Sequence, residues 1–199
     1  MQRSPRPTAG PTLAGSHTWC LMIPLPSLAP IAAVVAALDA HTTDEAVNWM
    51  RGLGKRELVA LWEKSEGNDA PIEALQGKEG EVIIHEGQNS LPLFNAFQKR
   101  VVLRNGKVQG YNHQAMSWIT GPGHFLVQTD GTTSWFDYTV VATDAPAEFP
   151  PIKGNDGFPD KLVYGGMIDK LRRVGTRALI GAAFRADKPT GDYFMLIRR

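Results

Sequence analysis

The sequence contains a single cysteine, Cys20, which excludes an internal disulfide and any zinc site built from several thiolates. It also lacks an excess of positive charge, because 21 Lys and Arg residues stand against 20 Asp and Glu residues. Proteins that bind a phosphate backbone are usually basic, so we expect no nucleic-acid partner. The uninterrupted apolar run from Ile31 to Leu38 is far shorter than the roughly 20 residues that cross a bilayer. We therefore expect no integral membrane segment.

Several chemical motifs are also missing. The chain has neither a phosphate-binding loop nor a Gly-x-Ser-x-Gly nucleophile motif. Its histidines show neither the helical i, i+4 spacing nor another arrangement typical of metal ligands, so we expect no metal and no cofactor. The five histidines are His17, His41, His85, His113 and His124.

The first part of the chain is unusual, because residues 1–38 contain no Asp or Glu. An acid-poor segment with Arg and Ser resembles an organellar transit peptide, and the apolar run resembles the core of a secretory signal. Residues 1–40 are therefore either a targeting leader or a disordered extension. The first alternative predicts an organellar or exported protein, and the second leaves the compartment unknown.

Residues 41–70 are expected to form short helices that pack on the rest of the domain. Thr42 precedes Glu45 by three residues, which is the spacing of a capping box at a helix start. Gly52 and Gly54 interrupt the helical pattern before it resumes. Trp49 and Trp62 lie on the apolar stripes, so we expect both in the core, with the helices covering one open end of the sheet.

Residues 71–199 show short β-branched and aromatic runs separated by turns. Asn105-Gly106 predicts a type I′ hairpin, and Asp130-Gly131 predicts a second hairpin. About eight sequential strands favour an antiparallel up-and-down β-barrel, since closure removes exposed edges. The expected strands are residues 81–85, 98–103, 107–119, 125–128 and 134–143, followed by three or four strands from residues 162–164, 167–174, 178–184 and 193–198.

The strand faces mix aromatic with polar side chains, as the lining of a small-molecule pocket does, although one face could instead be wet surface. The segment from His85 to Phe97 is long enough to cover a barrel mouth. The candidate ligand-binding residues are Tyr111, His113, Met116, Trp118, Trp135, Asp137, Tyr138 and Arg173.

The C-terminal strands resemble those of lipocalin-like (calycin) families. The resemblance covers roughly residues 75–199 and is carried by short motifs, with Glu79 where those families have a tryptophan. It implies a β-barrel that binds lipids, pigments or other apolar molecules, and it assigns no catalytic residue. The motifs are Leu162-Val163-Tyr164, Ile168-Asp169, Leu171-Arg172-Arg173-Val174, Leu179-Ile180-Gly181 and Tyr193-Phe194-Met195-Leu196.

Three functions follow from these patterns. The first is noncatalytic binding of a small apolar or amphipathic molecule inside the barrel. The second is an acid–base isomerase or lyase, with Asp137, His113 or a tyrosine moving the proton. Asp137 has a structural interpretation too, as a partner of Arg172, Arg173 or a neighbouring threonine. The third is a structural subunit of a larger complex, whose protein partners the sequence does not name.

Overall fold

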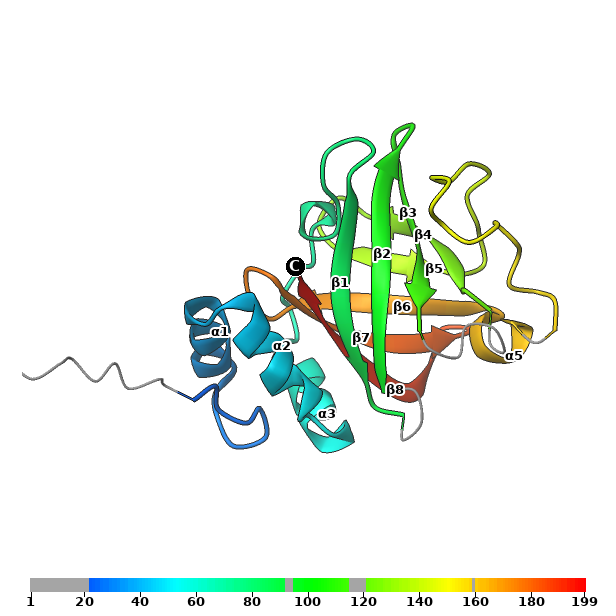
Figure 1. The fold of residues 1–199 in the computed structure, drawn as a ribbon. Coiled ribbons are helices and arrows are strands. Elements are labelled where there is room, and N and C mark those ends of the chain that lie inside the picture. Colours follow the sequence, from blue (N-terminus) through cyan, green and yellow to red (C-terminus); the bar gives the residue numbers. More distant parts are fainter. Residues whose placement is uncertain (1–21, 92–94, 115–120, 159) are drawn as a thin grey trace, which may run out of the picture.

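The computed structural model describes residues 22–91, 95–114, 121–158 and 160–199. Eight antiparallel strands form a closed barrel in which each strand pairs with the next along the chain and β8 pairs with β1 (Figure 1). The predicted mainly β fold, an up-and-down barrel with short N-terminal helices, is confirmed. The strands are β1 (Val82–Asn89), β2 (Ala96–Arg104), β3 (Lys107–His113), β4 (His124–Thr129), β5 (Ser134–Asp137), β6 (Met167–Arg173), β7 (Ala178–Arg185) and β8 (Lys188–Arg198).

Both predicted hairpins are present. Asn105 and Gly106 connect β2 to β3 with φ angles of 52° and 70°, and Arg104 pairs with Lys107 across the turn. Two adjacent positive φ angles are what a type I′ turn requires. The second hairpin joins β4 to β5, where the Asp130 carboxylate accepts hydrogen bonds from the backbone N–H groups of Thr132 and Thr133. These two local turns therefore set the register of two strand pairs, β2 with β3 and β4 with β5.

The strand predicted at residues 162–164 is wrong, because this segment belongs to a short helix, α5 (Asp160–Tyr164). A run of three apolar residues is too short for its periodicity to separate a strand from a helix. Gly165 and Gly166 follow directly, and Gly166 has a φ angle of 65°, which stops the helix. Leu162 is exposed whereas Tyr164 is buried, so α5 presents only one side to the barrel.

The barrel interior is densely packed towards one end. Side chains that alternate along the strands meet there, as in any closed barrel of this size. The segment with the 3₁₀ turn η1 (Ile72–Ala74) joins this cluster, and the His85 ring nitrogen Nε2 lies 3.3 Å from the Ala74 carbonyl oxygen. The cluster comprises Ala70, Leu75, Val101, Val108, Phe125, Val127, Phe136, Tyr138, Tyr164, Leu171, Leu179, Phe194 and Leu196.

From residue 22 onward, three α-helices precede the barrel: α1 (Ile31–Ala40), α2 (Thr43–Arg51) and α3 (Lys55–Lys64). The predicted capping box at Thr42 and Glu45 is present. The helices lie beside the barrel in Figure 1, and their apolar side chains pack with outward-facing residues of β7 and β8 such as Ile180 and Met195. Trp49 and Trp62 pack against this second apolar cluster, between the helices and the outer face of β7 and β8. The helices therefore cover an outer wall and not an open end, because those strands carry apolar side chains on both faces.

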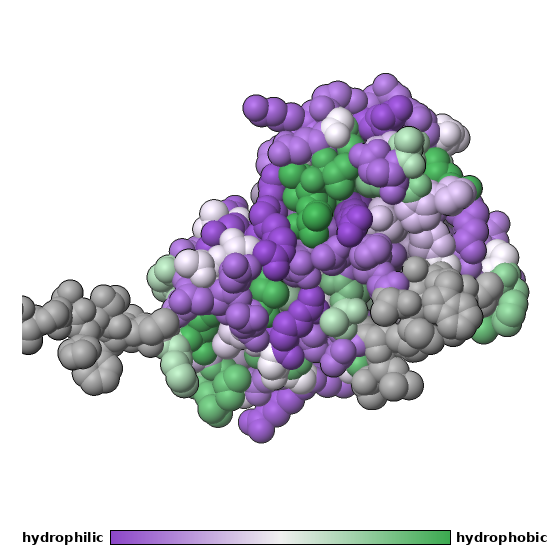
Figure 2. Space-filling model, viewed as in Figure 1, coloured by the Kyte–Doolittle hydropathy of each residue, from purple (hydrophilic) through white to green (hydrophobic). Residues whose placement is uncertain are grey.

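The N-terminal region is only partly described. Residues 1–21, where most of the expected leader falls, lie outside the described residues, while α1 falls within its last ten positions. In Figure 2 hydrophobic surface gathers over the segment before α1, where Met22, Leu25 and Leu28 are exposed. Within the described ranges, no helix combines the length and the apolar character needed to cross a membrane.

A glycine on β3 is required by close packing. A Cβ atom added to Gly110 would clash with the Arg100 backbone oxygen and lie 2.8 Å from the Phe125 ring. We therefore expect Gly110→Ala to lower the free energy of unfolding by about 2 kcal/mol, measured by urea denaturation. Gly157→Ala is the control, since its Cβ meets no atom within 4 Å. Equal stabilities of the two variants would contradict the tight packing at Gly110.

Candidate functional site

The part of the barrel interior that is not filled by the packed cluster holds a cavity of about 420 Å³. Volumes of this size are typical of sites that bind small organic molecules. Among the residues that the structure describes, its lining comes from six of the eight strands, from α5 and from their connections. The lining residues are Asn89, Leu91, Phe97, Lys99, Asn112, Gln114, Tyr138, Leu162, Val163, Tyr164, Met167, Asp169, Ala183, Arg185, Thr190, Asp192, Tyr193 and Phe194.

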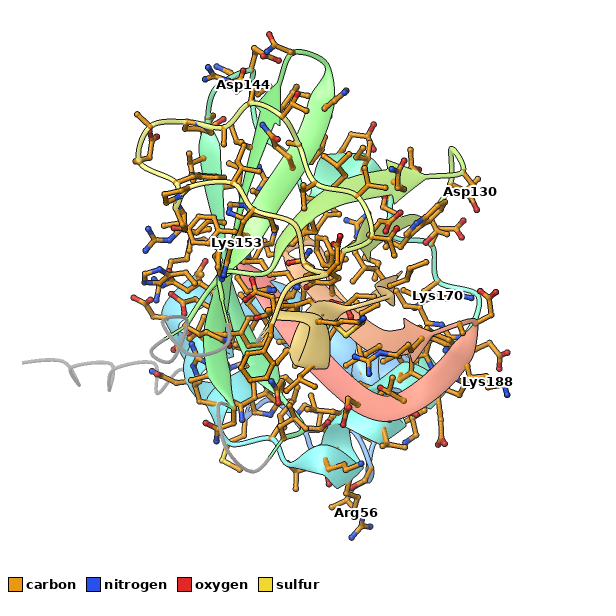
Figure 3. The ribbon with its side chains drawn as sticks, turned by 90° about the vertical axis from the view of Figure 1, so that its right-hand side faces the viewer. Arg56, Asp130, Asp144, Lys153, Lys170 and Lys188 are labelled. Carbon is orange, nitrogen blue, oxygen red and sulfur yellow. The ribbon has the colours of Figure 1, made fainter. Side chains whose placement is uncertain are left out.

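The rim of the cavity includes α5 and is partly apolar. Leu162 is 69% exposed and Leu91 is 42% exposed, although both border the cavity. Figure 2 shows hydrophobic surface at the edge of the molecule occupied by α5, and Figure 3 looks onto that helix. The lysines labelled there, Lys153, Lys170 and Lys188, lie around the outside of the barrel. An apolar molecule at this rim can therefore contact the exposed side chains of Leu91 and Leu162 before it reaches the interior.

A buried lysine lies between this cavity and the packed cluster. Lys99 is only 2% exposed and is among the largest fully buried side chains of the described chain. Its ammonium group lies 2.8 Å from Asn112 Oδ1, 2.5 Å from the Tyr138 hydroxyl and 3.3 Å from Asp169 Oδ2. Asp169 is itself 3% exposed, so the two opposite charges form a buried ion pair. These four residues from β2, β3, β6 and the end of β5 are the polar cluster of the site.

Several aromatic rings also lie close to the Lys99 ammonium group. The nitrogen lies 4.4 Å from the centre of the Phe136 ring and 4.9 Å from that of Phe125, within the range of cation–π attraction. Phe97, Tyr138 and Phe194 lie within 5.6 Å in the same way. The rings partly replace the water that a charged amine loses on burial, and they leave it in a site of low polarity.

Within the described residues, one oxygen atom of the polar cluster has no hydrogen-bond partner. An ammonium group has three N–H donors, and Lys99 has three acceptors at hydrogen-bonding distance. The Tyr138 hydroxyl accepts from Lys99 and lies 3.1 Å from Asp169 Oδ2, to which it donates. Asp169 Oδ1 is buried without a hydrogen-bond partner among the described residues. Because buried carboxylate oxygens normally have partners, this atom marks a place where the cluster is incomplete.

Burial shifts the proton affinities of the whole cluster. Loss of hydration lowers the pKa of Lys99 to about 8, although the Asp169 carboxylate opposes this shift. Loss of hydration also raises the pKa of Asp169 above its usual range, with Lys99 opposing. Burial raises the pKa of Tyr138 well above 10, and the nearby Asp169 charge adds to the effect. The phenol therefore stays protonated, and a proton moves between Lys99 and Asp169 more readily than between the same groups in water.

The sequence patterns did not predict the site residues Lys99, Asn112 and Asp169. Lys99 stands between Gln98 and Arg100, a polar run that resembles solvated surface. Alternation is the available clue, since Phe97, Lys99 and Val101 share one face of β2 and two of them are apolar. The same holds on β6, where Asp169 shares a face with Met167 and Leu171. A charged residue within an otherwise apolar strand face is thus the pattern that identifies this cluster.

Of the eight residues proposed from the sequence, Tyr138 lines the cavity. Tyr111 lies on the outer face of β3, where its ring packs 4.8 Å from that of Phe149, and the neighbouring His113 is exposed on the same face. Met116 and Trp118 lie outside the described residues. The structure therefore places Tyr138 apart from its proposed companions on β3.

The other three proposed residues also lie away from the cavity. Trp135 and Asp137 alternate with the buried Phe136 and so lie on the outer face of β5. The Asp137 carboxylate accepts hydrogen bonds from the backbone N–H and hydroxyl of Thr139, at 2.8 and 2.6 Å. Arg173 is exposed and borders a separate open hollow beside α1. Within the rim segment proposed at residues 85–97, Leu91 and Phe97 line the cavity, and residues 92–94 are not described.

In the described part of the chain, no three His, Cys, Asp or Glu side chains come close enough together to hold a metal ion. No known protein family, curated protein or solved structure matches the chain.

Proposed function

We propose that this protein binds a small, mainly apolar molecule in the open part of its barrel, as lipocalin-like proteins do. The observation that carries the proposal is the cavity of about 420 Å³, with its largely aromatic and aliphatic wall and one buried polar cluster. Ligand sites generally combine a large apolar surface with a few fixed polar groups. A β-barrel of eight strands is large enough to enclose one such molecule.

The charges of the lining favour a neutral ligand. Lys99 and Asp169 compensate each other inside the barrel, and the rim carries Arg185 and Asp192, again one of each sign. A carboxylate or ammonium group on the ligand would lose its hydration without gaining an unopposed partner. The ligand is therefore an uncharged molecule with a polar atom near the cluster, and free fatty acids are disfavoured.

Filling the cavity tests the proposal. Ala183 lines the cavity, so Ala183→Phe places a ring in the space of the ligand. We expect the purified protein to bind the neutral fluorescent probe 1-aminoanthracene with one-to-one stoichiometry. In Ala183→Phe the affinity falls roughly tenfold or more, because the probe and the new ring compete for the same volume.

Ala96→Phe is the matched control, since Ala96 is an exposed residue of β2. It should bind the probe as the unchanged protein does. Thermal unfolding of both variants distinguishes loss of the cavity from loss of the fold. Equal affinities of Ala183→Phe and Ala96→Phe would place the probe outside the barrel and contradict the proposal.

A further inference from the structure

The geometry points to Lys99 as a site of reversible covalent capture, where its amine condenses with an aldehyde or ketone group of the ligand to form an imine. Asp169 is the counter-ion of the protonated imine. This inference rests on the proposed function, because the carbonyl compound must first enter the barrel cavity. It adds the chemical class of the ligand, a neutral apolar molecule that carries a carbonyl group.

The position of the lysine supports this chemistry. Lys99 lines the cavity from β2, and its three polar neighbours, Asn112, Tyr138 and Asp169, line it as well. The eight other lysines are exposed, so Lys99 differs from all of them in its surroundings. A lysine placed in an apolar pocket loses its proton more easily, and the neutral amine is the nucleophile that forms imines.

The ion pair supplies the neutral amine without a proton from solvent. Lys99 Nζ lies 3.3 Å from Asp169 Oδ2, so the proton passes directly from the ammonium group to the carboxylate. Burial lowers the pKa of Lys99 to about 8 and raises that of Asp169, and both shifts favour the transfer. The product is an uncharged amine beside an uncharged carboxylic acid, in surroundings made largely of aromatic rings.

In the condensation, the atoms, protons and charges balance with the groups that the site supplies. The nitrogen lone pair attacks the carbonyl carbon, the C=O π bond opens, and proton transfer from nitrogen to oxygen gives a carbinolamine. The Asp169 carboxylic acid donates its proton to the hydroxyl group, the C–O bond breaks, and water leaves as the C=N bond forms. The result is a protonated imine on Lys99 and a carboxylate on Asp169, so the cluster ends with the charges it had at the start.

The neighbours of Lys99 also fit the product. The protonated imine keeps one N–H donor for the Asp169 carboxylate, and its positive charge stays within the ring of aromatic side chains. Tyr138 remains protonated, since burial raises its pKa well above 10, and its hydroxyl donates to Asp169 Oδ2. Water released in the reaction finds an unused acceptor in Asp169 Oδ1.

Reductive trapping tests the inference on the full chain. The protein is incubated at neutral pH with trans-cinnamaldehyde and sodium cyanoborohydride, and the adduct is located by peptide mass spectrometry. We expect one adduct per chain, located at Lys99, with a roughly tenfold or greater preference over each exposed lysine. Without reductant, the protonated imine should give an absorption band at longer wavelength than the free aldehyde.

Two variants test the roles of Lys99 and Asp169, and a third is the control. Lys99→Arg keeps the charge but removes the nucleophile, so the adduct should disappear. Asp169→Asn keeps the shape but removes the counter-ion, so the long-wavelength band should weaken because the imine loses its proton more easily. Lys170→Arg, which changes an exposed lysine of β6, should be labelled at Lys99 as the unchanged protein is.

Binding of trans-cinnamyl alcohol, measured by displacement of 1-aminoanthracene, separates this inference from the proposed function. If the alcohol displaces the probe and the aldehyde gives no adduct at Lys99, imine formation is contradicted while ligand binding stands. Adducts spread evenly over the exposed lysines contradict the inference in the same way. If the alcohol does not displace the probe and the aldehyde does not modify Lys99, the proposal that the ligand is a neutral apolar carbonyl compound is contradicted.

Discussion

Asp169→Leu is expected to lower the free energy of unfolding by about 3 to 5 kcal/mol, because it leaves the Lys99 amine buried without its counter-ion. The double variant Lys99→Met/Asp169→Leu should recover a large part of this loss. It replaces both charges with apolar side chains of similar length, and buried ion pairs often exchange for apolar residues at little cost. Guanidinium denaturation of the two variants and of the unchanged protein measures the effect.

Lys170→Met is the control for this comparison. Lys170 is the next residue on β6, is exposed, and lies 4.5 Å from the centre of the Phe184 ring. Losing an exposed cation–π contact should cost less than about 1 kcal/mol. If Asp169→Leu cost no more than Lys170→Met, the ion pair would not be buried as described.

Acid is expected to destabilise the protein through His85, which is 1% exposed on β1. Burial lowers the pKa of His85 to about 4, with the Ala74 carbonyl opposing, so the folded protein holds this ring neutral. The unfolded chain takes up the proton near pH 6.5, so it binds more protons than the folded state as pH falls from 6.5 to 4. His85 should therefore remove about 3 kcal/mol of stability across this window, and none above it.

Urea denaturation at a series of pH values measures this effect, and His85→Gln should make the dependence on pH shallower between 6.5 and 4. Part of the dependence of stability on pH should remain, since burial also lowers the pKa of His124. His113→Gln is the control, because that ring is exposed and should leave most of the slope in place. An identical slope in His85→Gln would show that His85 is not held neutral in the fold.

The strand order of this barrel could be predicted because local signals determine it. Asn105-Gly106 and the turn at Asp130 fix two hairpins, and pairing in chain order is then the simplest arrangement for the remaining strands. The capping box at Thr42 is equally local. The error at residues 162–164 arose where no such signal exists, since a short apolar run fits a helix turn as well as a strand.

The site was harder to predict because it depends on contacts between distant parts of the chain. Lys99 and Asp169 are 70 positions apart, and each looks like ordinary surface charge in its own segment. Alternation divides each strand into two faces but does not say which of them points inward. On β3 both faces carry buried side chains, because Phe149 covers Tyr111 from outside while Asn112 points into the barrel. Polarity alone therefore could not select the inner face.

Closure of the sheet has a kinetic consequence for any molecule inside. Strands β1 and β8 pair over five residues, so leaving through the wall would require breaking several ladder hydrogen bonds together. The opposite end is filled by Leu75 and its neighbours. Exchange must therefore pass the rim formed in part by α5, a single turn of helix held by the buried Asp160 and its ion pair with Lys153. Residence time should accordingly follow how often this rim opens. A substitution at Asp160, which holds α5 but does not line the cavity, would therefore change association and dissociation rates together while leaving the equilibrium affinity nearly constant.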